Sequence, residues 1–145
     1  MTEKINEKNL IEQLRLAFPE IEVSYQSRLG AYDGKRLPSN YEVVGFVFKP
    51  KLEDELSKGE LTEFLRRASV FIERVCDSGD AEAINVVWIK VFEWLIFRPK
   101  ELDLLWPTLG AMTKENIKDA ARRWSVAGRY FGKTKNLPTS NLPEQ

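Results

Sequence analysis

The fold is decided by residues 60–97, ELTEFLRRASVFIERVCDSGDAEAINVVWIKVFEWLIF. Over residues 61–76 the apolar side chains recur at the i, i+3, i+4, i+7 spacing of one helical face, and most charged side chains take the other face. The chain then turns at residues 77–80, DSGD, where Gly79 can adopt the left-handed conformation that ends a helix and Asp80 can cap the next one. A connection this short predicts two antiparallel helices in contact.

The second helix of this pair, about residues 81–97, is apolar on nearly every side. Beyond its first turn the only polar side chains are Asn85, Lys90 and Glu93. A helix with this pattern is typical of the centre of a helical core. It is a poor membrane span, because a span needs about 20 apolar residues and charges near its centre are costly. Glu93 is either buried beside a cationic or hydrogen-bonding partner, or exposed and paired with Lys90 one turn away.

The composition excludes several kinds of chemistry. The 145 residues include 22 basic and 22 acidic side chains, for a formal net charge of +0, so the whole chain offers no electrostatic argument for nucleic acid or an anionic membrane. Without histidine it has no histidine base, no Ser-His or Cys-His pair and no imidazole metal ligand. Its one cysteine, Cys76, cannot form an internal disulfide and is expected to be a small buried side chain. We expect no catalytic residue, metal or cofactor, and the lack of a signal-peptide pattern predicts a cytoplasmic location.

Amphipathic spacing predicts further helices on both sides of the central pair. Residues 3–18 predict a first helix, with Asn6 or Thr2 as a candidate cap, and the proline that follows ends it. Residues 19–34 predict a second helix that closes at an Asp-Gly pair. The last helix is expected over about residues 114–131, with Thr113 as its cap.

Residues 41–48 fit two kinds of structure. Valine and phenylalanine dominate this stretch, YEVVGFVF, and favour a short strand. The same stretch also continues one helical face, formed by Tyr41, Val44, Phe48, Leu52 and Leu56. A strand needs a partner, and the chain contains no second convincing strand. Because Ser39 and Glu42 also form the pattern of a capping box, we expect a helix that is broken or kinked near Pro50.

Together these elements predict an all-α protein. We expect a single-domain bundle or short stack of about six or seven helices around a central antiparallel helix pair. The helical domain is expected to cover residues 1–132. Residues 133–145 are polar and proline-bearing, and they are expected to form a flexible C-terminal tail.

The order of several short motifs is similar to that of a known family. The motifs are Phe18-Pro19-Glu20, Leu37-Pro38, Phe71-Ile72-Glu73, Gly79-Asp80, Asn85, Glu93-Trp94-Leu95 and Leu109-Gly110. In this order they resemble a small, all-helical bacterial domain of unknown function, over about residues 10–120. A basic or proline-like residue usually follows the Leu-Gly motif of that family, and Ala111 departs from it. Related domains look like the small single-domain proteins that accompany bacterial polymorphic toxins, which implies an immunity-type protein and no chemistry.

The tryptophans support a protein-binding surface. Trp88 lies on the core face of its helix, but Trp94 and Trp106 are not both expected to fit inside. An exposed tryptophan beside arginine is typical of a protein-binding hot spot, although each can equally be an ordinary core aromatic. The candidate protein-binding residues are Trp94, Trp106, Glu93 and Arg98. Our leading hypothesis is a non-enzymatic protein-interaction module, of the bacterial immunity type, that binds and neutralises a partner protein as a monomer or homodimer.

A basic and aromatic stretch near the C-terminus supports an alternative. Residues 122–135 contain no acid, and aromatic side chains interleave with the candidate nucleic-acid-binding residues Arg122, Arg123, Arg129, Lys133 and Lys135. The stretch also has a structural explanation, because positive charge is favoured at a helix C-terminus and Trp124 fits a core position of the last helix.

Carboxylates supply the remaining candidates for chemistry. The run Glu53-Asp54-Glu55 could hold a hard cation, but a solvated helix start explains it better. An enzyme that uses only carboxylates, lysine and tyrosine is a third hypothesis, and it requires a deep pocket near Glu73 or Glu93.

Overall fold

The computed structural model describes residues 3–124. These residues form seven helical rods and no strand, so the predicted all-α class is confirmed. The rods are α1 (Leu10–Ala17); η1 (Pro19–Ile21) with α2 (Glu22–Ala31); α3 (Asn40–Val43), η2 (Val44–Phe48) and α4 (Lys49–Leu56) in line; α5 (Glu63–Asp77); α6 (Ala81–Val87), η3 (Trp88–Phe92) and α7 (Glu93–Leu95) in line; α8 (Pro99–Leu105) with η4 (Trp106–Thr108); and α9 (Ala111–Arg123). The turns η1 and η4 are 3-10 helical, and η2 and η3 are π-helical. The predicted tail, residues 133–145, lies outside the described residues.

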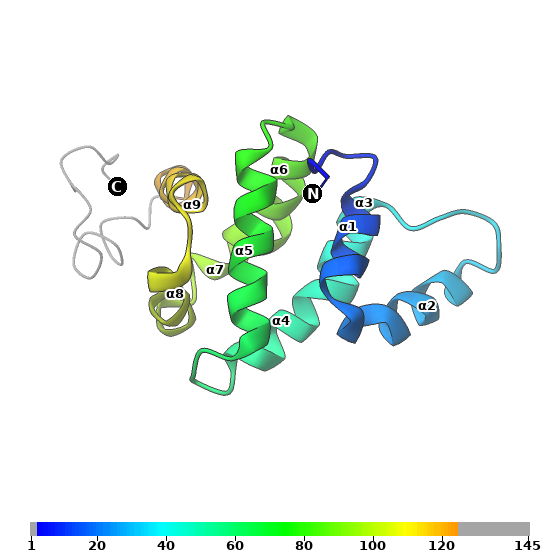
Figure 1. Ribbon diagram of the computed structural model, residues 1–145, viewed down its shortest axis with the longest axis horizontal. Helices are drawn as coiled ribbons and strands as arrows, with labels where there is room; N and C mark the ends of the chain where they lie inside the picture. The colour runs from blue at the N-terminus through cyan, green and yellow to red at the C-terminus, as the bar shows by residue number, and fades with distance from the viewer. Residues whose placement is uncertain (1–2, 125–145) are drawn as a thin grey trace.

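Helix α5 stands at the centre of the molecule (Figure 1). It contacts α1 and α4 on one side, α9 on the other, and α6 behind it. The antiparallel α5–α6 pair is therefore as predicted, and the 81–97 rod packs centrally with α5, since it contacts α3, η2, α5, α8 and α9. Eight buried residues, all apolar except Ser69, make the buried stripe of α5 wide enough to meet neighbours on three sides. The 81–97 rod buries seven residues and leaves Ile89 and Phe97 exposed; the buried ones are Ala83, Val86, Val87, Val91, Phe92, Leu95 and Ile96.

The corner between α5 and α6 forms as its residues predict. Gly79 has a φ of +77°, the left-handed conformation that a side chain disfavours. The Asp80 side chain accepts a hydrogen bond from the Ala83 N–H at 3.0 Å and so caps α6. At the other end of α5, Thr62 accepts from the Leu65 N–H at 3.2 Å. Side-chain caps therefore fix where both helices begin.

The first helix is shorter than predicted, since α1 begins at Leu10 rather than near residue 3. The cause is the predicted cap itself. The Asn6 side chain accepts from the N–H groups of Lys8 and Asn9, and the Asn9 side chain accepts from the Asn6 N–H. These bonds hold a turn in place of regular helix. Ile5 is nevertheless buried and ties the preceding segment to the core.

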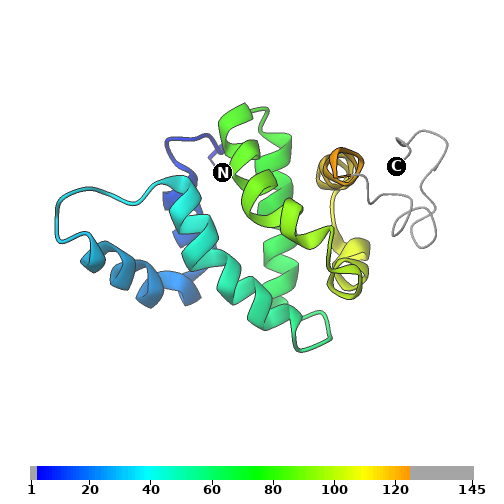
Figure 2. The same ribbon diagram turned by 180° about the vertical axis from the view of Figure 1, so that it is seen from behind.

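The ambiguous stretch at residues 41–48 is helical, as we expected. Ser39 and Glu42 form both bonds of the capping box at the start of α3. Of the predicted break or kink near Pro50, the break is absent, because α3, η2 and α4 continue as one rod (Figure 2). A π-helical turn precedes Pro50 instead. Its wider spacing accommodates a ring that would otherwise press on the carbonyl four residues back.

A cluster of four phenylalanines joins the end of α1 to η2 and α5. Phe18 lies at its centre, with ring centroids 5.0 Å from Phe48, 5.1 Å from Phe64 and 5.6 Å from Phe71. Phe18 and Phe48 are fully buried. Pro19 ends α1 immediately after Phe18, as predicted, so the ring turns inward at the point where the chain changes direction.

The last helix begins one turn earlier than predicted, with Gly110 at its N-cap position. Thr113 is therefore not the cap. The carboxylate of Glu73, from α5, accepts from the N–H of Met112 at 3.2 Å and from the N–H of Thr113 at 2.8 Å. It also accepts from the Thr113 hydroxyl at 2.7 Å. A side chain of the central helix thus caps α9, and sequence spacing could not show this.

Candidate functional site

The two composite rods meet where both are π-helical. A Cβ at position 45 would lie 3.1 Å from Lys90 Cδ and 3.3 Å from Lys90 Cε, so the bare glycine lets η3 approach η2. Lys90 therefore lies across Gly45, and no ion pair joins it to Glu93 among residues 3–124. The predicted Lys90–Glu93 pair is not found there. π-helical turns occur often at functional sites. The seam between η2 and η3 is therefore a candidate functional site.

Large apolar side chains remain exposed on both sides of the seam. We call this surface the aromatic face, and it consists of Phe46, Ile89, Trp94, Phe97 and Trp124 with the cations Lys49, Lys90 and Arg98. Phe46 is 58% exposed, Phe97 46% and Trp124 50%. Both rods that carry most of it face the viewer in Figure 2. Exposed aromatic side chains gathered in this way indicate an interaction surface.

Cations surround the half-buried Trp94 ring. Lys49 Nζ lies 5.2 Å from the ring centroid and the Arg98 guanidinium carbon lies 5.7 Å from it. A T-shaped contact, with centroids 6.3 Å apart, joins Phe97 to Trp124. These contacts connect α4, α7 and the end of α9 across the face.

The charge of the aromatic face is mostly uncompensated within the described part of the chain. None of its three cations forms an ion pair there. Glu93 is half buried in α7 and also has no ion pair in that part. The face is therefore a basic, aromatic surface that complements an acidic one.

The structure brings together three of the four predicted protein-binding residues. Trp94, Glu93 and Arg98 follow one another through α7 and the turn after it. Trp106 lies elsewhere, in η4, with Lys114 Nζ 5.3 Å from its ring centroid. The candidate surface therefore excludes Trp106.

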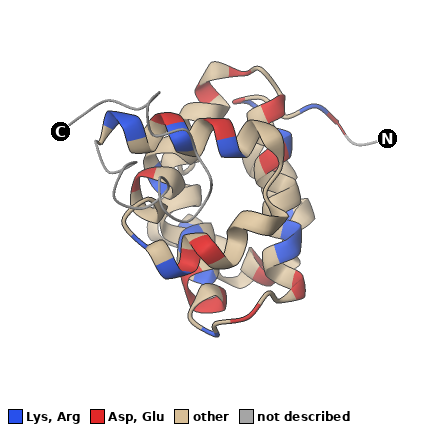
Figure 3. Cartoon of the chain, turned by 90° about the vertical axis from the view of Figure 1, so that its left-hand side faces the viewer, with Lys and Arg blue, Asp and Glu red and all other residues tan. Residues whose placement is uncertain are grey.

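The predicted nucleic-acid-binding stretch is only partly described. Arg122 forms an ion pair with Asp119, and the Arg123 guanidinium carbon lies 5.9 Å from the Trp88 ring centroid. Arg129, Lys133 and Lys135 lie outside the described residues, as do the remaining positions after Trp124. Acidic and basic residues alternate along the described length of α9 (Figure 3), so that helix is not a uniformly basic surface. Trp124 is half exposed, and the prediction that it is a core residue is wrong.

Six residues of the aromatic face were not among the predicted protein-binding residues, and for two of them, Phe46 and Phe97, the sequence carries a signal. Phe46 falls off the helical face formed by Tyr41, Val44, Phe48, Leu52 and Leu56. Phe97 shares the polar arc of its helix with Lys90 and Glu93. An aromatic residue that falls outside the apolar stripe of a helix predicts exposure, and both are exposed.

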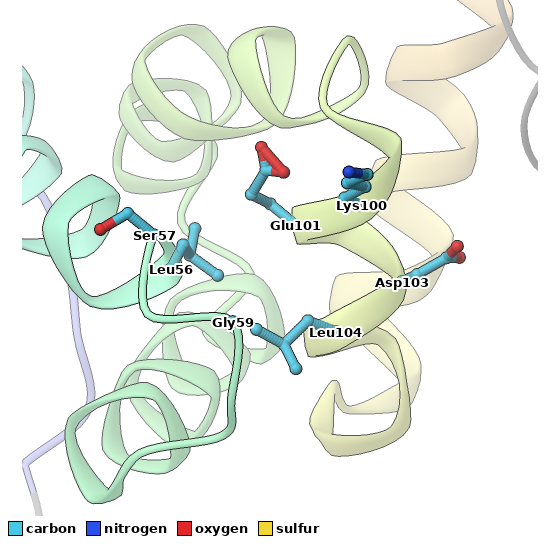
Figure 4. Close-up of a pocket in the computed structure, with 7 residues that line it drawn as sticks. All are labelled: Leu56, Ser57, Gly59, Lys100, Glu101, Asp103 and Leu104. Atoms are coloured by element: carbon cyan, nitrogen blue, oxygen red, sulfur yellow. The ribbon is translucent and has the colours of Figure 1, made fainter.

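The largest hollow described lies between the end of α4 and α8 (Figure 4). Its volume is about 550 Å³, and its wall includes Leu56, Ser57, Gly59, Lys100, Glu101, Asp103 and Leu104. Glu101 points into the hollow, whereas Asp103 points away from it (Figure 4). The two carboxylates therefore do not face each other as an acid–base pair would. Neither Glu73 nor Glu93 belongs to this wall.

Glu55, the last residue of the acidic run in α4, has a structural role. Glu55 is buried, with its side chain 6% exposed, and it lies in the last turn of the helix rather than at a solvated start. Lys58 donates to its carboxylate at 2.9 Å and the Thr62 hydroxyl donates at 2.7 Å. These bonds lower the pKa of Glu55 to about 2. Within residues 3–124 no group of three or more acidic or cysteine side chains is placed to hold a metal ion.

Two further observations concern chemistry and membranes. Cys76 is buried as predicted, and burial raises the pKa of its thiol to about 12, which disfavours the reactive thiolate. Among residues 3–124, no helix combines the length and apolar character that crossing a bilayer requires.

A comparison with models of known protein families identifies the family of this chain. A family model described as a domain of unknown function, DUF7674, matches residues 11–125. The chain belongs to this family. The match covers most of the chain, and the predicted resemblance to a small helical domain of unknown function is confirmed. No curated protein and no solved structure matches the chain.

Proposed function

We propose that this DUF7674 protein is a non-enzymatic interaction module that binds a partner protein through its aromatic face. One observation carries the proposal: Phe97 and Trp124, whose rings are in contact, are about half exposed close to Trp94 and its neighbouring cations, and Phe46 is 58% exposed on the adjoining rod, where the Arg28 guanidinium carbon lies 4.4 Å from its ring centroid. Aromatic side chains and arginine dominate the binding energy of protein interfaces.

The charges of the face indicate the kind of partner. Because Lys49, Lys90 and Arg98 have no ion pair within residues 3–124, a partner with acidic residues around an apolar centre would complement them. An interface of ordinary size buries about 800 Å² on each partner. A face that spans two composite rods and the end of α9 can supply such an area.

The chemistry of the described residues supports a binding role over catalysis. The only cysteine is buried, the chain has no histidine, and the carboxylates of the largest described hollow do not face each other. The resemblance to domains that accompany polymorphic toxins supports an immunity-type role, in which the bound partner would be neutralised.

The test is affinity purification from the cell that encodes the protein, using the wild-type chain and the double variant Phe46→Ser with Phe97→Ser. We expect one partner protein to co-purify with the wild type and its recovery to fall at least tenfold with the double variant. Both side chains are exposed, so their replacement should leave the fold intact, which circular dichroism can check.

A matched control is Val23→Ser, since Val23 is 84% exposed on α2 and outside the aromatic face. This variant should retain the partner at the wild-type level. If no protein depends on Phe46 and Phe97, or if nucleic acid is retained instead, the proposed function is wrong.

A further inference from the structure

A second surface lies on α5, away from the aromatic face. Its neighbours cover α5 on both sides and behind, so its open side is the one that faces the viewer in Figure 1. A groove of about 450 Å³ lies along α5 beside the C-terminal end of α1, with Ala17, Glu63, Arg66, Arg67, Val70, Phe71 and Arg74 on its wall. We call it the arginine groove. Val70 is 63% exposed and lies midway along α5.

The cations of the arginine groove are regularly spaced. Arg66, Val70 and Arg74 recur at i, i+4 and i+8, so they form one stripe whose ends are about 12 Å apart along the helix. The third arginine, Arg67, already forms ion pairs with Glu20 and Glu63. No carboxylate among the described residues pairs with Arg66 or Arg74.

Arg74 is the most unusual of these residues. Its guanidinium is half buried and donates to the Glu3 backbone carbonyl at 3.1 Å and to Gln13 Oε1 at 2.9 Å. Both acceptors are uncharged. Burial lowers the pKa of Arg74, which reflects the cost of a cation removed from water without a counter-ion. An anionic group placed here from outside would offset that cost.

We propose that the arginine groove docks an acidic, amphipathic helix of a partner protein. An apolar side chain of that helix would lie over Val70 and Phe71, and carboxylates one turn to either side would pair with Arg66 and Arg74. The i, i+4, i+8 spacing of the stripe matches the spacing of side chains along one face of a second helix. A phosphate or a nucleic-acid backbone would use the arginines but would leave the apolar floor uncovered. No residue of the groove belongs to the aromatic face, so the two proposals can fail separately.

The test selects helical peptides with randomised outer positions against the full 145-residue chain. The affinity of enriched peptides is then measured by fluorescence anisotropy for the wild type, Val70→Asp and Val23→Asp. We expect enriched peptides with an apolar residue between acids one turn away on each side. We expect Val70→Asp to weaken their binding at least tenfold and Val23→Asp, which adds the same charge at another exposed valine, to leave it unchanged. Added salt should also weaken binding.

Three results would overturn the proposal. In the first, no enriched peptide loses affinity for Val70→Asp. In the second, the enriched peptides lack acidic residues. In the third, a duplex oligonucleotide displaces every peptide and binds more tightly, which would assign the groove to nucleic acid. Arg66→Glu provides a second variant on an exposed side chain, and it should weaken the same peptides by a similar factor.

Discussion

At the scale of single residues, Glu73 and Gly110 form the most specific contact of the molecule. The Glu73 carboxylate caps α9 through three hydrogen bonds, to two N–H groups and one hydroxyl. A Cβ at position 110 would lie 2.3 Å from the carboxyl carbon of Glu73, so the glycine provides the space in which that carboxylate sits. The two residues therefore depend on each other.

This dependence predicts a non-additive pair of substitutions. Glu73→Ala should lower the free energy of unfolding by about 1–2 kcal/mol, the usual cost of a lost helix cap. Gly110→Ala should cost a similar amount, because the new methyl group displaces the carboxylate. Urea denaturation of the single and double variants measures the coupling. Once Glu73 is alanine, Gly110→Ala should cost almost nothing, and simple addition of the two losses would contradict this account.

Glu55 predicts how stability depends on pH. Its pKa in the folded chain is about 2, below the ordinary 4.5, because Lys58 and Thr62 donate to its charged form. A lowered folded pKa stabilises the protein above pH 4.5, and this contribution is lost as the pH falls from 4.5 towards 2. The difference in unfolding free energy between wild type and Glu55→Gln should therefore shrink over that range. Glu53→Gln, at an exposed neighbour, should show no such trend, and a constant Glu55 difference would contradict the assignment.

At the scale of elements, Phe18 predicts how α1 is held. Its ring contacts phenylalanines of π-turn η2 and of α5, so Phe18→Ala should open a cavity and cost about 3–5 kcal/mol of unfolding free energy. Phe46→Ala, at an exposed ring two residues from Phe48, should change it by less than about 0.5 kcal/mol. Thermal and urea unfolding measure both. Equal losses of unfolding free energy in the two variants would contradict the packing of Phe18 at the centre of the phenylalanine cluster.

The sequence could predict those elements whose cause is local. The stripe of α5, the Gly79 corner and the Ser39–Glu42 capping box depend on residues a few positions apart, and all of them form. The shortened α1 was not foreseen, because the bonds between Asn6 and Asn9 compete with the helix that their spacing otherwise favours.

What the sequence could not predict depends on contacts between distant residues. The Glu73 cap joins residues about forty positions apart. Which helices pack around α5 and the 81–97 rod also depends on such contacts. Of the candidate site, Trp94, Glu93 and Arg98 could be named in advance, but their grouping with Phe46 and Lys49 required the contact between the two composite rods.

At the scale of the whole molecule, α5 separates two surfaces of different character. The aromatic face lies on the rods that face the viewer in Figure 2, and the arginine groove is lined by α5 and the last residue of α1. Both are basic and partly apolar, yet they share no residue.

The central claim, that the aromatic face binds a protein, can be tested most directly by site-specific photocrosslinking in the cell that encodes the protein. A photoreactive phenylalanine analogue replaces Phe97 in one variant and Val23 in another, both at exposed positions. The account predicts one discrete crosslinked protein from position 97 and none from position 23. The same products from both positions, or a crosslink from position 97 to nucleic acid alone, would contradict it.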